Sequence, residues 1–277
     1  VSYTSADFSV SGGTLAIRSV KPTRAALPGG VYIHLDATDE TTFGKTLKAD
    51  GVTYGLETWA DWRGDGYLTA THSTTNLPTV SSATIAGKTM PVIDFGPVMT
   101  SSGTTLIGQG KATSMTFANL GQVRSMAVVI GSRQGGGAIS GSTKSSVLGG
   151  LVRQNKGVSA SDYLFATGTQ IPRYIQNGRD QNDLPGGAHW RLNGAEVKAR
   201  ATGLSGAFDL VTVRTPDTFG VNALSAYNYG FTCGGQEIGE IIYWERMLTE
   251  DEMKQVEAYL REKWFGVARP AEYVGAT

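Results

Sequence analysis

Three glutamates near the C-terminus, Glu237, Glu240 and Glu245, have the side chains that acid–base chemistry would need. Most enzymes that hydrolyse glycosidic bonds use two carboxyl groups about 5–10 Å apart. These glutamates lie in or next to a segment whose alternating apolar residues predict a β-strand, with odd and even positions on opposite faces. Strict alternation sends Glu237 and Glu240 to opposite faces, where they cannot act on one bond. We therefore do not expect catalysis by this group.

Clusters of oxygen-bearing side chains indicate a second kind of chemistry, the binding of calcium. Calcium prefers carboxylate and amide oxygens as ligands. Such side chains gather at Asp36, Asp39 and Glu40, at Asp61 and Asp65, and at Asp180, Asn182 and Asp183. Asp and Asn are also common turn formers, so turns alone would explain these clusters. We predict a structural calcium, with the candidate ligands Asp36, Asp39, Asp180 and Asp183.

A third set of residues combines aromatic rings with amides, acids and arginines, as sugar-binding sites do. Aromatic faces stack on a sugar ring, and a few polar groups fix its hydroxyls. The candidate ligand-binding residues are Tyr163, Arg173, Tyr174, Arg179, Asp180, Asn182, Trp190, Arg191, Tyr227 and Tyr229. Ordinary packing would explain any single member equally well. Tyr174, His189 and Arg191 also offer the base and the uronate-neutralising group of a polysaccharide lyase.

Other catalytic and metal-binding patterns are missing from the sequence. The histidines His34, His72 and His189 do not show the spacing of a zinc site. The single cysteine, Cys233, excludes an internal disulfide and a cysteine-based zinc cluster. No serine lies in a G-x-S-x-G motif.

The composition favours a β-rich protein and argues against two classes of partner. Glycine accounts for 37 of 277 residues, well above the usual ~7%, as expected for many strands joined by tight turns. Lys plus Arg equals Asp plus Glu at 24 each, without a basic stripe, so we expect no nucleic acid partner. No apolar run approaches the ~20 residues that span a bilayer, so we expect no membrane insertion. The chain begins at Val1, which suggests a mature form or an excised domain.

The C-terminal region contains the clearest elements. Residues 236–244 predict a strand buried on both faces, with Ile238 on the face of Ile242 and Trp244. Thr249 and Glu252 form a T-x-x-E capping box that starts an amphipathic helix. Its apolar stripe is Met253, Val256, Leu260 and Trp264, and its solvent-facing residues are Glu250, Lys254, Glu257 and Glu262.

Other strands follow from alternation and turn signals. We expect a hairpin at residues 7–20, and strands at residues 31–35, 67–70, 90–95, 115–117, 126–130, 146–152, 163–167 and 208–213. A second hairpin at residues 189–197 turns at Asn193-Gly194, a type I′ signal. This pattern predicts an all-β protein, a two-sheet antiparallel jelly-roll sandwich with one C-terminal amphipathic helix.

Several motifs resemble the laminin-G-like, concanavalin-A-like jelly roll of bacterial extracellular proteins. They are residues 34–39 (HLDATD), 59–66 (WADWRGDG), 92–95 (VIDF), 192–194 (LNG), 238–249 (IGEIIYWERMLT) and 259–264 (YLREKW). The resemblance covers about residues 30–266. It implies two curved sheets, secretion, frequent carbohydrate binding and sometimes a structural calcium. It also implies that Glu240 is a buried structural acid, with Arg246 as a candidate partner, and that Trp59 and Trp62 serve packing.

We therefore expect an N-terminal hairpin and linker at residues 1–28, the jelly roll at 29–266 and a tail at 267–277. The expected function is that of a non-catalytic, lectin-like module that binds a polysaccharide or glycan. It would belong to a larger multidomain protein that is secreted or displayed at the cell surface. A polysaccharide-degrading enzyme on the same fold and a structural or adhesion domain are the alternatives.

Overall fold

The structure is a computed structural model. It describes residues 8–11, 14–17, 27–62, 69–72, 77–96, 98–99, 105–107, 113, 115–132, 187–198, 202–205, 207–224, 226–227, 231–232 and 236–273. The strands expected at residues 146–152 and 163–167 lie outside these ranges.

Most of the described strands belong to one antiparallel sheet. Its members are β3 (Val31–Asp36), β4 (Phe43–Leu47), β5 (Tyr54–Ala60), β6 (Thr69–His72), β7 (Thr79–Ile85), β8 (Lys88–Asp94), β11 (Met115–Ser132), β12 (His189–Leu192), β13 (Ala195–Val197), β14 (Phe208–Leu224) and β17 (Gln236–Trp244). Two-stranded pairs are formed by β1 (Phe8–Ser11) with β2 (Thr14–Ile17), β9 (Val98–Met99) with β10 (Thr105–Ile107), and β15 (Ala226–Tyr227) with β16 (Phe231–Thr232). The helices are α1 (Glu250–Phe265) and two short 3-10 turns, η2 (Glu40–Thr42) and η3 (Ala271–Tyr273).

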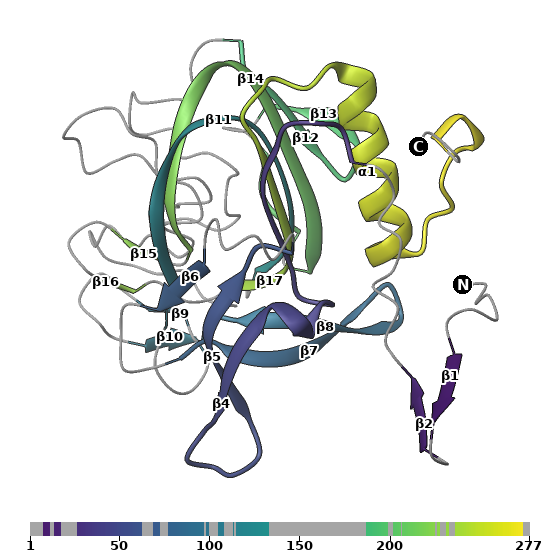
Figure 1. The fold of residues 1–277 in the computed structure, drawn as a ribbon. Coiled ribbons are helices and arrows are strands. Elements are labelled where there is room, and N and C mark those ends of the chain that lie inside the picture. The colour runs from purple at the N-terminus through teal and green to yellow at the C-terminus, as the bar shows by residue number, and fades with distance from the viewer. Residues whose placement is uncertain are drawn as a thin grey trace.

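The large sheet has 11 strands in the order β13-β12-β14-β11-β6-β5-β7-β8-β17-β3, with β4 on β5. An additional pairing of β11 with β17 closes six of these strands into a ring. In Figure 1 the long strands β11 and β14 arch over the upper part, and β7 and β8 run across the lower part. The predicted β-rich fold with a C-terminal helix is confirmed. The described strands form one large curved sheet and three two-stranded pairs, and the predicted two-sheet sandwich is not shown among them.

Strand β17 lies at the centre of this arrangement, between β11 and β3, and its first residues also pair with β8. Every residue of β17 except Glu237 is buried. This burial on both faces confirms the prediction for residues 236–244, which coincides with the observed strand.

A β-bulge at Gly239 changes which side chains share a face. Glu240 pairs with Val129 and Ile238 with Ile130, so Gly239 has no residue opposite it in β11. Ile238 therefore lies on the face opposite Glu240, while Glu237, paired with Gly131, shares the face of Glu240. The predictions that Ile238 shares the face of Ile242 and that Glu237 and Glu240 point apart are wrong, because alternation breaks at this bulge.

Helix α1 begins as the sequence predicts. Thr249 accepts from the backbone N–H of Glu252, whose side chain accepts from the backbone N–H of Thr249, completing the capping box. The chain leaves the helix at Gly266, which has a left-handed φ of 67°. The apolar stripe is buried as predicted, at Met253, Val256, Leu260 and Trp264.

One helical residue does not face solvent as predicted. Glu257 is buried and its Oε1 accepts from Arg191 Nε at 2.8 Å and from Thr212 Oγ1 at 2.7 Å. Figure 1 shows α1 beside β12 and β13, which brings the hairpin against this side of the helix.

The hairpin formed by β12 and β13 turns at Asn193 (φ 52°) and Gly194 (φ 86°), so the predicted type I′ turn is confirmed.

The bulge yields a first prediction, for the substitution Gly239→Ala. A Cβ at this position would lie 2.7 Å from the ring of Trp264, which is fully buried. We expect the free energy of unfolding to fall by about 1–3 kcal/mol, measured by urea denaturation. Gly121→Ala in β11 is the matched control, because a Cβ there meets nothing within 4 Å. Equal losses in both variants would contradict the proposed crowding.

The start of α1 yields a second prediction, on pH. The hydrogen bond from Arg246 outweighs partial burial and lowers the pKa of Glu252 to about 2. A carboxyl whose pKa falls on folding stabilises the protein above its unfolded pKa of about 4.3 and loses this contribution as the pH falls towards 2. We expect Glu252→Gln to weaken the pH dependence of unfolding free energy between these values. An unchanged slope in urea titrations would contradict this assignment.

Candidate functional site

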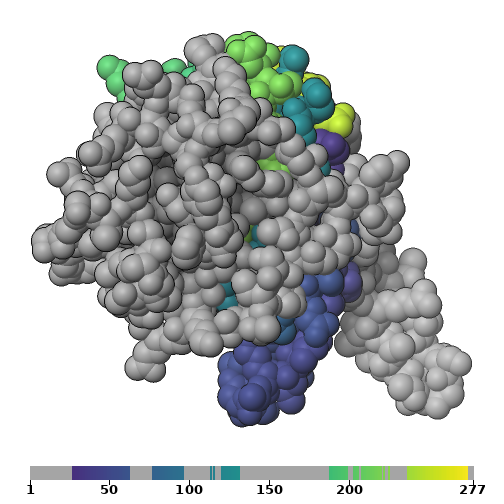
Figure 2. Space-filling view, turned by 90° about the vertical axis from the view of Figure 1, so that its left-hand side faces the viewer, coloured from purple at the N-terminus to yellow at the C-terminus, as the bar shows by residue number. Residues whose placement is uncertain are grey.

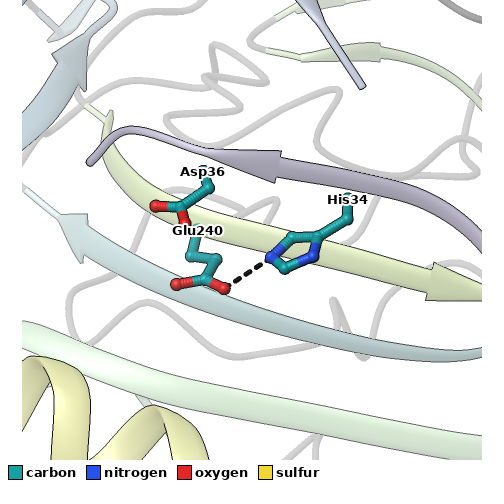
Figure 3. A group of neighbouring side chains, drawn as sticks. All are labelled: His34, Asp36 and Glu240. Carbon is teal, nitrogen blue, oxygen red and sulfur yellow. Dashed lines mark hydrogen bonds and ion pairs between the residues drawn. The ribbon is translucent and has the colours of Figure 1, made fainter. Parts of the chain in front are cut away.

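The most distinctive group of polar side chains in the described chain is His34, Asp36 and Glu240, which Figure 3 shows between neighbouring strands. His34 and Asp36 are two residues apart on β3 and therefore share a face. Asp36 pairs with Glu240 of β17 across the sheet. All three side chains are buried. The flanking Ile33 and Leu35 are buried as well, so the polar group is enclosed on strands that are themselves part of the core.

Glu240 accepts hydrogen bonds from two elements besides its own strand. Its Oε1 lies 2.6 Å from His34 Nε2 and accepts from the Tyr259 hydroxyl at 3.1 Å. Its Oε2 accepts from Trp264 Nε1 at 2.7 Å and from Lys263 Nζ at 2.6 Å. A buried carboxylate is tolerated only when it is paired and hydrogen-bonded in this way.

Lys263 provides the positive charge of the group. Its ammonium contacts Asp36 Oδ2 at 2.7 Å as well as Glu240, and its side chain is 20% exposed. It also lies 5.3 Å from the ring centre of Trp264, within reach of a cation–π interaction. Burial raises the pKa of Glu240, but the charge of Lys263 and the hydrogen bond from His34 outweigh it and hold that pKa well below its usual range. The site therefore holds an ionised Glu240.

The two oxygens of Asp36 have different partners. Oδ1 accepts from the backbone N–H of Thr38 at 2.9 Å and from its hydroxyl at 2.7 Å, whereas Oδ2 faces Lys263. His34 is fixed at its backbone, whose N–H donates to Asp61 Oδ1 at 2.9 Å, and at its ring, which meets Trp62 edge-on at 6.0 Å. His34, Asp36 and Glu240 therefore each have hydrogen-bond partners outside the group of three.

His34, Asp36 and Glu240 could hold a metal ion, because each offers a ligand atom and these atoms lie within 4.8 Å of one another. An imidazole with two carboxylates suits zinc or manganese, whereas calcium takes about 6–8 oxygen ligands. Lys263 already neutralises both carboxylates, so a metal would have to displace its ammonium.

Two of the four predicted calcium ligands, Asp36 and Asp39, lie in the described chain, and their side chains have different partners. Asp36 belongs to the buried group. Asp39 does not, since its Oδ1 accepts from Thr41 at the start of η2. Asp180 and Asp183 lie outside the described residues. Glu240 had no spacing signal relating it to His34, because 206 residues separate them.

The expectation that Arg246 pairs with Glu240 is wrong. Lys263 occupies that role, whereas Arg246 donates to Glu252 at 2.5 and 2.8 Å and to the carbonyl of Gly29 at 2.8 Å. Arg246 thus stabilises the start of α1, whereas Glu240 is bound by Lys263 and Trp264 near the end of that helix. The expectation that Glu240 is a buried structural acid agrees with its contacts.

Trp190 and Arg191 are the predicted sugar-binding residues whose side chains the structure describes. Trp190 is buried in the core, and Arg191 is bound to Glu257 and to the carbonyl of Gly194. Tyr227 lies on β15, and its side chain is not among those described. The other candidates lie outside the described residues, namely Tyr163, Arg173, Tyr174, Arg179, Asp180, Asn182 and Tyr229.

The buried group is not arranged for glycoside hydrolysis. Glu240 has no exposed surface and already accepts from His34, Tyr259, Lys263 and Trp264, so a glycosidic oxygen has no access to it. Its low pKa also keeps it from acting as a general acid near neutral pH.

No protein-family model matches the chain, and no curated protein is significantly similar to it in sequence. Within the described residues, no helix is long and apolar enough to cross a membrane.

Removal of the lysine charge provides a third prediction. Lys263→Ala leaves two buried carboxylates without their cation, which costs about 3–5 kcal/mol of unfolding free energy. We expect added Zn²⁺ or Mn²⁺ to raise the Tm of this variant, measured calorimetrically, but not that of the unsubstituted protein. Lys254→Ala is the control, since its ion pair with Glu250 is exposed. Equal metal-induced shifts in all three proteins would contradict a site at His34, Asp36 and Glu240.

Proposed function

We propose that the chain is a non-catalytic carbohydrate-binding module with a laminin-G-like, concanavalin-A-like jelly roll. In this proposal it belongs to a secreted or cell-surface multidomain protein and binds a polysaccharide or glycan. The sequence motifs that resemble that family and the curved antiparallel sheet with its closing helix support the proposed fold. Function has to be argued separately, because one fold serves many functions.

The observation that carries the proposal is the exposed ring of Tyr54 on the hairpin of β4 and β5. Tyr54 is 45% exposed and is the one aromatic residue among the large exposed apolar side chains of the described chain. Figure 2 shows this hairpin as a projection at the lower edge of the molecule. A projecting aromatic face is suited to stack on a sugar ring.

An ammonium group lies beside this ring. Lys45 Nζ lies 5.3 Å from its centre and forms an ion pair with Glu40 at 2.5 Å. Charged groups beside an aromatic ring are among the contacts that bind sugar hydroxyls.

The alternative of a polysaccharide-degrading enzyme has less support from the described residues. Glu240 is enclosed and ion-paired, and Arg191, the candidate that would neutralise a uronate, is engaged with Glu257. His189 is exposed on β12, with Glu196 3.9 Å away. A glycoside hydrolase needs a second carboxyl group, and a lyase needs a cation or amide that neutralises the uronate. The pair of His189 and Glu196 provides neither.

A structural calcium remains part of the proposal. Since Lys263 neutralises Asp36 and Glu240, we place the ion outside their group, among oxygen-rich turns. Binding and thermal unfolding are therefore to be measured both in calcium and after chelation.

The role of an adhesion domain is a second candidate, favoured by the apolar tip of the same hairpin. Leu47 is 49% exposed and Val52 is 78% exposed, and both lie near Tyr54 in the hairpin. Exposed apolar side chains at a projection are a common feature of protein-binding surfaces.

Our fourth prediction concerns glycan binding. On a glycan array and with plant, algal and bacterial polysaccharides, we expect retention of at least one glycan, with Tyr54→Ala weakening it about tenfold through lost stacking. Tyr273→Ala is the matched control, because Tyr273 lies in η3 after the C-terminal helix. Retention of no glycan at millimolar concentrations would contradict the carbohydrate-binding function. Binding unchanged in Tyr54→Ala would contradict the site.

A further inference from the structure

The turn between β12 and β13 contains a chemically labile pair, Asn193 followed by Gly194. Asparagine degrades most readily before glycine, because the glycine nitrogen can reach the side-chain amide without hindrance and displace ammonia from it. Asn193 is exposed, so water has access to it. We propose that Asn193 is a deamidation site that the closed hairpin protects, and that the reaction makes any opening of this hairpin permanent.

The reaction needs only water. The backbone nitrogen of Gly194 loses its proton and bonds to Cγ of Asn193. The Cγ–Nδ2 bond breaks, and ammonia leaves with that proton, which gives a succinimide ring. Water then adds to either ring carbonyl and opens the ring to aspartate or to isoaspartate. One water is consumed and one ammonia is released, and nothing is oxidised or reduced.

In the closed hairpin both polar atoms of the Asn193 side chain are bound to β14. Its Nδ2 donates to Asp209 Oδ1 at 2.8 Å, and its Oδ1 accepts from the backbone N–H of Leu210 at 2.8 Å. Ring closure has to rotate Cγ towards the nitrogen of Gly194, which breaks these hydrogen bonds. The closed form therefore slows a reaction that the exposure of Asn193 would otherwise allow.

The backbone of the turn is held in place as well. Asn193 and Gly194 have φ values of 52° and 86°, and the backbone N–H of Asn193 donates to the carbonyl of Leu210 at 2.8 Å. The carbonyl of Gly194 accepts from Arg191, and a Cβ on Gly194 would lie 3.1 Å from the guanidinium of Arg261. The turn cannot change its conformation without leaving β14 and α1.

Asp209 makes the product incompatible with the closed hairpin. Its side chain is buried, and its Oδ2 accepts from the backbone N–H and the hydroxyl of Ser205 at 2.7 and 3.0 Å. Deamidation replaces the donor that faces Oδ1 by an oxygen. Two carboxylates at this distance repel each other and cannot both stay ionised. Aspartate at position 193 thus loses a hydrogen bond and gains a like charge.

Isoaspartate is incompatible with the turn for a different reason. Its main chain runs through the former side-chain carbonyl, which lengthens the turn by one carbon. The two-residue turn sets the pairing of Leu192 with Ala195, so this pairing is lost. With either product the hairpin stays open, and Arg191 no longer reaches Glu257 on α1. Opening permits the reaction, and the product prevents closing.

Peptide mass spectrometry of the full chain tests the protection. The sequence contains a second Asn-Gly pair, Asn177-Gly178, and in urea we expect both pairs to deamidate at similar rates. Without urea at the same pH, we expect Asn193 to deamidate at least about tenfold more slowly than in urea, because opening must break a charge-assisted hydrogen bond. Deamidation of Asn193 as fast in the folded protein as in urea would overturn the proposal.

A variant at Asp209 tests the source of the protection. Asp209→Ala removes the acceptor of Asn193 Nδ2, so we expect deamidation in the folded protein to become about tenfold faster. Gly239→Ala is the matched control, since it crowds β17 against Trp264 and leaves the turn unaltered. Equal acceleration in both variants would overturn the role of Asp209.

A charge exchange tests why the product cannot close. Asn193→Asp creates the product directly, and we expect it to lower the urea midpoint. In Asn193→Asp/Asp209→Asn an amide and a carboxylate face each other again, so we expect the midpoint to recover relative to the sum of the single variants. The double variant can be measured even where Asn193→Asp fails to fold. A parent-like midpoint for Asn193→Asp, or the absence of recovery, would overturn the proposed repulsion.

Discussion

The burial of the Glu240 carboxylate is the constraint on which the rest of the structure depends. A carboxylate with no exposed surface must have a cation and several hydrogen-bond donors, because removal from water costs several kcal/mol. Here the donors come from β3 and from the last turns of α1, while Glu240 itself comes from β17. The positions of these three elements are therefore linked to one another through a single side chain. Displacing any of them would leave a buried charge without its partners.

The elements that depend on neighbours in the sequence could be predicted, and those that depend on distant residues could not. The bounds of β17, the capping box at Thr249 and the type I′ turn at Asn193-Gly194 all follow from local chemistry. The bulge at Gly239 was not predicted, although a glycine within a strand often marks a bulge or a close approach, here that of the Trp264 ring. That one residue reverses the relation between the faces of Glu237 and Glu240.

The candidate site was predictable only in part for the same reason. Glu240 could be identified as a structural acid, but its cation comes from Lys263, which no spacing pattern relates to it. Residue type also did not show which aromatic and basic side chains are exposed. Trp190 lies in the core and Arg191 is bound to Glu257, whereas Tyr54 is exposed on a hairpin. Residue type indicates which contacts a side chain can make, and only the tertiary structure decides which of them it makes.

The place of β17 in the sheet has a consequence for the order in which the chain can fold during synthesis. Strand β3 ends the main path of the sheet, and its one neighbour there, β17, is formed by residues 236–244. A ribosome releases the chain from its N-terminus, so the edge of β3 that pairs with β17 stays uncovered until residues 236–244 have been made. The six-stranded ring also cannot close before β17 arrives. Pairings between such distant segments slow folding, and they leave a nascent chain of this kind dependent on protection of its open strand edges.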